Sequence, residues 1–200
     1  MDAVINAFLA YFVIVDPIGV TLIFNALTDG KTDTYRKKMA IRAVCLSTVL
    51  ILCFGFWGSS LLQLLGIQME SFKIAGGLLI FYAAFGMITK SDAVDEDQVV
   101  TEQDDISVFP LSIPMIAGPG SLTLTILLFS QASENNETFT PLIIAIILIY
   151  SLTLVCFLLS RMIVRVVGKT INNILKRLLG VLLASLAIQF IADGIKGLMG

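Results

Sequence analysis

The amino-acid sequence predicts an all-α integral membrane protein with six transmembrane helices, built as two inverted three-helix repeats whose first and fourth helices are broken. Three observations predict this class: 57% of the 200 residues are apolar, the mean hydropathy is +0.94, and only 14% of the residues are charged. Soluble domains carry about 25% charged residues, so this composition favours a chain that lies in lipid. The net charge of −2 gives no support to a nucleic-acid partner, and the lipid bilayer is the first partner that we expect.

Six apolar segments are long enough to cross a bilayer, which takes about 20 residues in a helix. They cover the ranges 4–27, 40–65, 71–89, 108–131, 141–166 and 175–198. The second and fifth contain the cleanest apolar runs, whereas DPIG interrupts the first and PMIAGPGS interrupts the fourth. Because proline cannot donate a backbone hydrogen bond and clashes with the preceding turn, we expect both helices to break at these motifs.

The six segments use the whole chain and leave no room for a separate soluble domain. We expect a first repeat at 1–89, an acidic cytoplasmic loop at 90–107 and a second repeat at 108–200. Apart from Lys73 and Lys196, every Lys and Arg falls on the side of the membrane that holds this loop. The positive-inside rule therefore predicts that both termini lie outside the cytoplasm.

The two halves of the chain share one order of features. A shift of 102 residues places Pro17 on Pro119 and Gly66 on Gly168. Each half then consists of a broken helix, a long helix and a third helix with a basic residue near its start. Because three spans is an odd number, the second half enters the membrane from the opposite side. Inverted repeats of this kind are common in secondary transporters, which bind their substrates near the membrane midplane between discontinuous helices.

Each break starts a half-helix with unpaired N–H groups and a positive dipole end, which favours an anion such as a substrate carboxylate. Pro17 and Pro119 suit the first helical turn, where a missing N–H costs least. The candidate N–H donors belong to Ile18, Gly19 and Val20 in the first half and to Gly120, Ser121 and Leu122 in the second. Polar side chains close by complete the candidate substrate site: Thr21 and Asn25, which share one helix face, and Ser121, Thr123 and Thr125.

Asp16 is a carboxylate inside the first apolar segment, and it has three interpretations. It caps the half-helix, it binds a coupling cation or a substrate ammonium, or it carries a proton. A carboxylate at membrane depth is costly, so we favour a role in transport, with or without capping. The sequence indicates no catalytic or metal site, because it has no histidine, no nucleophile–base pair and no metal-type cysteine spacing.

Two longer segments around the breaks resemble a known family. DPIGVTLIFNALT at 16–28 and IPMIAGPGSLTLTI at 113–126 resemble the two signature segments of the MarC family of bacterial and archaeal inner-membrane proteins. The similarity covers essentially the whole chain. Because this family resembles LysE-type exporters and some members look like neutral amino-acid transporters, the resemblance implies transport of a small molecule. It assigns site roles to Asp16, Pro17 and Gly19 and to Gly118, Pro119, Gly120 and Ser121. Relatives often have Asn after the motif glycine, where this chain has Val20.

We therefore expect a secondary transporter of small neutral solutes, with neutral amino acids as the first class to test, working by alternating access around a midplane site. A coupling ion, Na⁺ or H⁺, is compatible with the sequence, and no other cofactor is expected. Three alternatives stay open: a channel-like solute pore, an intramembrane enzyme acting on a lipid, and a non-transporting scaffold. The absence of a catalytic constellation argues against the enzyme, so we do not expect catalysis. The sequence leaves open the exact solute, the direction of transport and the formation of a homo-oligomer.

Overall fold

The computed structural model describes residues 2–89 and 106–199, all of them in helices or short connections. The predicted acidic loop at 90–107 lies outside the described residues except for its last two positions. The elements, in order, are α1 (Asp2–Val15), α2 (Pro17–Leu27), α3 (Asp33–Leu64), α4 (Met69–Thr89), the π-helix η1 (Ser107–Ile116), α5 (Pro119–Glu134), α6 (Thr140–Leu158) and α7 (Ser160–Met199). This confirms the all-α prediction for the described part of the chain.

Five stretches of the described chain are long and apolar enough to cross a membrane. They are Ala3–Leu27, Asp33–Leu64, Met69–Thr89, Thr140–Leu158 and Arg177–Met199. The predicted fourth span, 108–131, is not among them, because its chain is divided between η1 and α5. Pro110 and Pro114 explain the irregular winding of η1, since each lacks an N–H and clashes with the carbonyl four residues earlier in an α-helix.

Three predicted boundaries differ from the structure. The second helix begins at Asp33 instead of residue 40, because the Thr32 hydroxyl caps it and accepts a hydrogen bond from the Tyr35 N–H at 3.3 Å. The fifth helix ends at Leu158, before the predicted end at 166, because the chain turns at Leu159. Residues 160–166 belong instead to α7, which begins well before the predicted sixth segment. Apolar composition continues across this turn, so hydropathy alone did not mark it.

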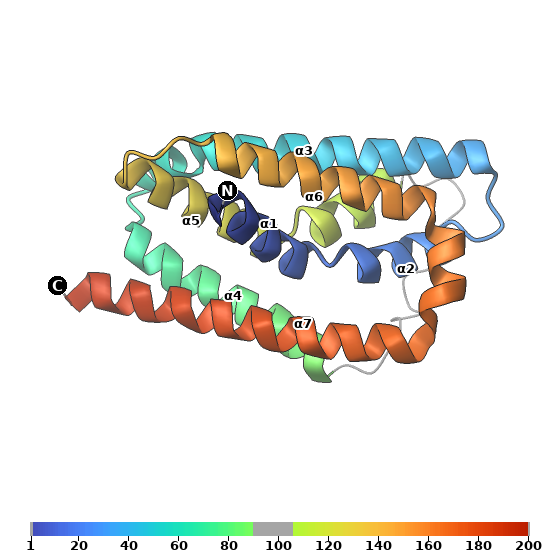
Figure 1. The fold of residues 1–200 in the computed structure, drawn as a ribbon. Coiled ribbons are helices and arrows are strands. Elements are labelled where there is room, and N and C mark those ends of the chain that lie inside the picture. The colour runs from blue at the N-terminus through green and yellow to red at the C-terminus, as the bar shows by residue number, and fades with distance from the viewer. Residues whose placement is uncertain (1, 90–105, 200) are drawn as a thin grey trace.

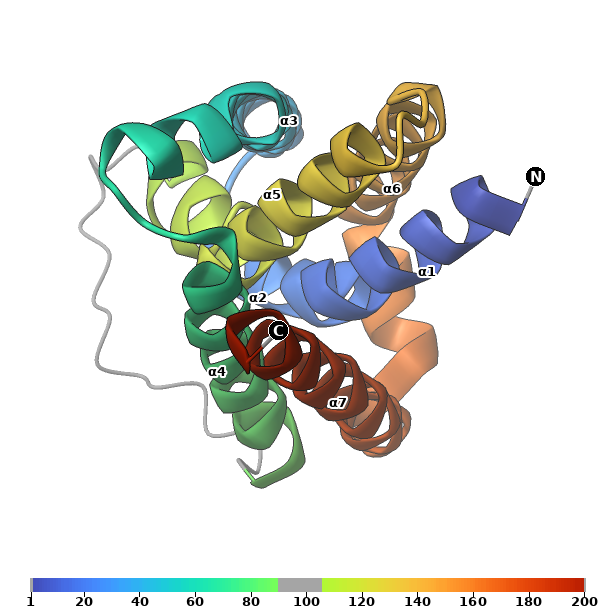
Figure 2. The same ribbon diagram turned by 90° about the vertical axis from the view of Figure 1, so that its left-hand side faces the viewer.

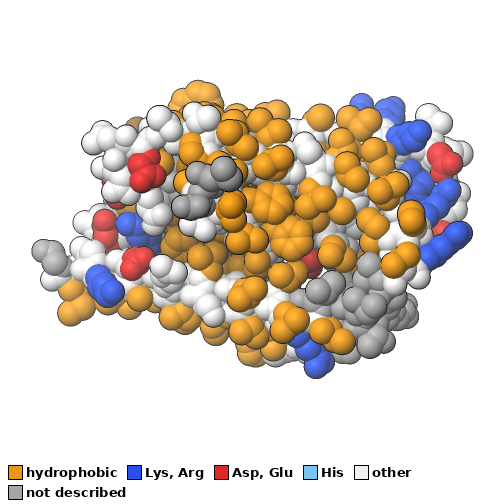
Figure 3. Space-filling model, viewed as in Figure 1, with side chains coloured by type: hydrophobic (Ala, Val, Ile, Leu, Met, Phe, Trp, Pro, Cys, Tyr) orange, Lys and Arg blue, Asp and Glu red, His pale blue; other side chains and the backbone are white. Residues whose placement is uncertain are grey.

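The helices run lengthwise between two ends of the molecule, and both termini lie at the same end (Figure 1). Viewed from that end, α2 and α5 lie near the centre, with α3, α4, α6 and α7 around them (Figure 2). Large apolar side chains such as Trp57, Tyr82 and Val166 are exposed on the outside of the bundle. Apolar side chains cover the middle of the surface, and Lys and Arg gather at the end opposite the termini (Figure 3). An apolar exterior with charged ends is the surface that a bilayer requires.

Glycines set the distance between α4 and α7, which pack along much of their length. A Cβ on Gly77 would lie 2.9 Å from the Ala187 carbonyl oxygen of α7, so only glycine allows this approach. Gly86 lies on the same helix, and a Cβ there would meet nothing within 4 Å. Close backbone approach through small residues is the usual way in which membrane helices associate.

We predict that Gly77→Ala destabilises the protein by about 1–3 kcal/mol, because α4 and α7 must move apart to accommodate the methyl group. Gly86→Ala is the matched control and should leave stability unchanged or slightly higher. Unfolding by SDS in mixed micelles measures both variants. Equal stability of the two would show that α4 and α7 do not pack as described.

Candidate functional site

The first break is made by Asp16, which lies between the end of α1 and the first residue of α2. Its backbone is left-handed, with φ 45° and ψ 66°, a conformation that Asp tolerates better than most residues. One carboxylate oxygen accepts a hydrogen bond from the Gly19 N–H at 3.0 Å, and the Asp16 carbonyl accepts one from the Val20 N–H at 3.0 Å. Asp16 therefore caps α2 and places a negative charge at the positive end of that half-helix.

The geometry of this cap explains the residue types of the motif D-P-x-G. Pro17 occupies the first helical position, where its fixed φ is favourable and its missing N–H is not needed. Gly19 has no side chain, and a Cβ at this position would collide with the Asp16 carboxylate. The glycine therefore leaves the space in which the carboxylate reaches the backbone. The predicted donors Gly19 N–H and Val20 N–H are both bonded to Asp16 in this conformation.

The second break uses different chemistry. Gly118 is extended, with ψ 173°, and Pro119 begins α5. The Ser121 hydroxyl lies 3.0 Å from both the Ile116 and the Gly118 carbonyl oxygens, so it donates to the carbonyl groups at the break. Gly120 and Ser121 lie in the first turn of α5, where backbone N–H groups have no partner within the helix. The Leu122 N–H, in contrast, bonds to the Gly118 carbonyl at 3.0 Å.

The two breaks lie near each other in the bundle. A Cβ on Gly120 would be 3.1 Å from Cδ1 of Ile14, which precedes Asp16 by two residues. Helix α2 also contacts η1, and α1 contacts α5. A carboxylate and the N-terminal turn of a second half-helix therefore occupy one region of the bundle interior.

A pair of tyrosines lies beside the breaks. The Tyr11 hydroxyl of α1 donates to Thr125 Oγ1 of α5 at 2.8 Å, and Thr125 donates in turn to the Ser121 carbonyl at 2.7 Å. Tyr150 of α6 is buried in the same core cluster as Tyr11. The Tyr150 hydroxyl is buried, and within the described part of the chain it has no hydrogen-bond partner. An unpaired buried hydroxyl costs stability, and a bound water or solute is the usual reason for keeping one.

A cavity of about 380 Å³ opens at the end of the molecule that carries the termini. Polar side chains from α1, α5, α7 and the α5–α6 loop line it: Asn6, Gln131, Asn135, Glu137, Thr138, Gln189 and Asp193. Its inner wall reaches Ala10 on α1 and Leu124 on α5. The Tyr11–Thr125 hydrogen bond joins the residues that follow these two in the sequence, so it lies beside the inner wall of the cavity.

The other predicted side chains lie in different places. Thr21 is fully buried, and its hydroxyl donates to the Pro17 carbonyl at 2.6 Å, so it supports the first turn of α2. Thr123 faces α4, where it fills the space beside Gly76. Asn25 lies outside the region of the breaks, because its side-chain oxygen accepts a hydrogen bond from Arg36 at 2.9 Å. Asn25 shares a helix face with Thr21 and lies one turn further from Asp16 along α2.

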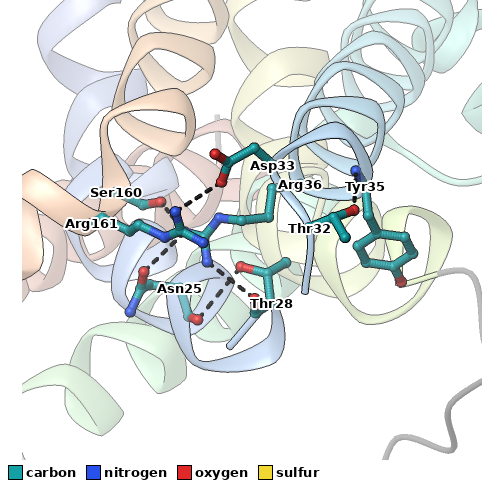
Figure 4. Close-up of polar contacts among 8 residues, drawn as sticks. All are labelled: Asn25, Thr28, Thr32, Asp33, Tyr35, Arg36, Ser160 and Arg161. Carbon is teal, nitrogen blue, oxygen red and sulfur yellow. Dashed lines mark hydrogen bonds and ion pairs between the residues drawn. The ribbon is translucent and has the colours of Figure 1, made fainter. Parts of the chain in front are cut away.

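Arg36 is the functional-site candidate that the sequence did not indicate, because a base in a polar segment is typical of a cytoplasmic loop. It lies in the first turn of α3 and is only 7% exposed. Besides Asn25, its guanidinium donates to the Thr28 carbonyl at 3.1 Å and to Ser160 Oγ at 2.7 Å (Figure 4). It also lies 5.6 Å from the ring centre of Phe24. Arg36 thus joins α2, α3 and the start of α7 at the basic end.

Comparisons with known proteins agree with the motifs at the breaks. The family model described as "MarC family integral membrane protein" matches residues 1–199. A UPF0056 membrane protein of Buchnera aphidicola is 37% identical over 97% of this chain and 92% of its own length. The UPF0056 membrane protein YvbG of Bacillus subtilis is 33% identical over 98% of this chain and 95% of its own length. The UPF0056 membrane protein YhcE of Escherichia coli is 34% identical over 96% of this chain and 91% of its own length. No solved structure matches this chain.

We predict opposite effects for two Tyr→Phe variants. Tyr11→Phe removes the donor to Thr125 and should lower the free energy of unfolding by about 1 kcal/mol. Tyr150→Phe removes an unpaired hydroxyl and should leave the protein equally or more stable in the absence of solute. Unfolding in mixed micelles compares the two. A larger loss for Tyr150→Phe would contradict the hydrogen-bond assignment.

Proposed function

Since the chain belongs to the MarC family of integral membrane proteins, we propose that it is a secondary transporter of small neutral solutes, with neutral amino acids as the expected class. The observation that carries this proposal is the pairing of two unlike helix breaks. One presents a carboxylate and the other presents the N-terminal turn of a half-helix. An amino acid carries the complementary pair of charges within a few ångströms.

The solute's carboxylate would bind at the start of α5. There the N–H groups of Gly120 and Ser121 and the positive end of the helix dipole favour an anion. The start of α2 is less suitable, because the Asp16 carboxylate already occupies it. This revises the symmetric site expected from the sequence, in which both half-helices bound the carboxylate.

The solute's ammonium group would bind Asp16. A carboxylate can accept about four hydrogen bonds, and it bonds most strongly to a charged donor such as an ammonium group. Branched apolar residues lie around the breaks and would limit the size of the solute's side chain: Ile14, Ile18 and Val20. A coupling ion, Na⁺ or H⁺, would compete for the same carboxylate.

The order of the elements supports two inverted repeats and six crossings. A broken helix, a long helix and a third helix occur in that order as α1–α2, α3 and α4, and again as η1–α5, α6 and α7. In this reading η1 and α5 together form the sixth crossing, as α1 and α2 together form the first. Carriers of this construction bind solute between the two broken helices and move one repeat against the other.

The conformation fits one state of such a cycle. The end with the termini holds the open cavity of about 380 Å³. At the basic end, Arg36 and the stacked rings of Phe24 and Phe157 close the path toward the breaks, and the two ring centres are 4.4 Å apart. By the positive-inside rule the basic end is cytoplasmic, so this state would face outward. Opening the basic end would require Arg36 to release the end of α2.

The test is counterflow of labelled glycine, alanine, serine and threonine in proteoliposomes, with and without a sodium or proton gradient. We expect saturable counterflow of at least one of them, and a fall of about tenfold or more in Asp16→Asn, because a hydrogen bond between charged groups is lost. Asn keeps the left-handed backbone, so the variant should fold.

Asp29→Asn is the matched control, because it makes the same change at an exposed turn outside the cavities. It should transport like the wild type. Uncoupled flux without counterflow would indicate that the protein is a channel and not a carrier. No flux of any of the four solutes through folded protein would overturn the assignment to neutral amino acids.

A further inference from the structure

We infer that the basic end of the bundle carries a binding site for a phosphoryl anion, separate from the breaks and argued from observations other than those that support transport. A cavity of about 230 Å³ lies there between α3, the end of α6 and the start of α7. Its lining consists of Asp33, Arg36, Lys37, Phe157, Leu158 and Arg161. A phosphate group, with the volume of a few water molecules, fits within this space.

The charges around the cavity are unbalanced. Among the described residues that line the cavity, three bases face one acid, and Asp33 is already paired, since it lies 2.8 Å from the Arg161 guanidinium. That ion pair is largely exposed, so it contributes little stability. Arg36 and Arg161 are close enough to repel each other. An anion between the two guanidinium groups would remove this repulsion, and the bases would supply its hydrogen bonds.

Arg36 is held in place for this role. Its three hydrogen bonds to Asn25, Thr28 and Ser160 use three of the five guanidinium donors and fix the plane of the group (Figure 4). A guanidinium that is already oriented loses little entropy when it binds an oxyanion. Lys37 and Arg161 are exposed and can adjust around the ligand.

Helix ends add to the positive potential. Asp33, Arg36 and Lys37 lie at the start of α3, and Arg161 is the second residue of α7. The N-terminal ends of both helices therefore border the cavity, and each carries a partial positive charge. The C-terminal end of α6 also borders the cavity and carries a partial negative charge, so the three helix ends together still contribute a positive potential. Together with the buried guanidinium and the unbalanced bases, they make the cavity selective for anions.

The surroundings of the cavity favour a lipid headgroup as the source of the phosphoryl group. Leu158 lines the cavity and is also 47% exposed, and its neighbours Leu159 and Met162 are exposed as well. The cavity thus borders the apolar outer surface at a membrane end, where the phosphate of an anionic phospholipid would lie. A free phosphate ion offers the same chemistry, so the experiment separates the two sources.

The test measures thermal unfolding of the full chain in a neutral detergent. The probes are dihexanoyl phosphatidylglycerol, dihexanoyl phosphatidylcholine and inorganic phosphate, each against chloride at equal ionic strength. We expect phosphatidylglycerol to raise the Tm in a saturable manner. The double variant Lys37→Gln/Arg161→Gln should need about tenfold more lipid for the same rise, as expected when charged hydrogen bonds are lost.

The control is Lys73→Gln/Lys196→Gln, which removes the same charge from the opposite end and should respond like the wild type. A response to phosphatidylglycerol alone supports a lipid headgroup, and an equal response to inorganic phosphate supports a free anion at the same site. Three results would overturn the site. They are no rise in Tm with either phosphatidylglycerol or inorganic phosphate, an equal rise with phosphatidylcholine, and an equal loss of the lipid response in both double variants. Because this test measures thermal unfolding, its outcome does not depend on the result of the transport assay.

Discussion

Every backbone group that a broken helix frees at membrane depth must find a partner inside the protein, and the centre of this bundle is organised by that constraint. At the first break the Asp16 carboxylate pairs with the start of α2, and at the second the Ser121 hydroxyl lies within hydrogen-bonding distance of carbonyl groups before α5. The first solution adds a negative charge, whereas the second adds none at the positive N-terminal end of α5. The polarity of the proposed site arises from this difference.

The two ends of the bundle are built differently around this centre. One end holds an open cavity with both polar and apolar lining, whose inner wall reaches Ala10 and Leu124. At the other, a buried guanidinium bonds to neutral oxygens at the end of α2 and the start of α7, and among the described residues it forms no direct ion pair. Removing such partners from a buried charge is expensive, so in the proposed cycle the opening of this end would cost free energy.

The breaks themselves could be predicted, because proline and glycine act on the local backbone whatever surrounds them. The depth of each polar side chain in the bundle and its hydrogen-bond partners could not be predicted. Asn25 shares a helix face with Thr21, yet its partner Arg36 comes from another helix, and periodicity carries no information about such contacts. Tyr11 and Tyr150 lie in apolar runs where a single hydroxyl hardly changes the hydropathy. The turn at Leu159 was also missed, because the residues on both sides are apolar.

The most direct test of a site that holds both charges of an amino acid is competition against alanine counterflow by alanine, propionate and alaninamide. Propionate lacks the ammonium group and alaninamide lacks the carboxylate. We predict that only alanine competes with the wild type, and that Asp16→Asn loses much of the preference for alanine over propionate. If propionate competes with the wild type as well as alanine does, Asp16 does not bind the ammonium group, and the pairing of the two breaks around one amino acid is wrong.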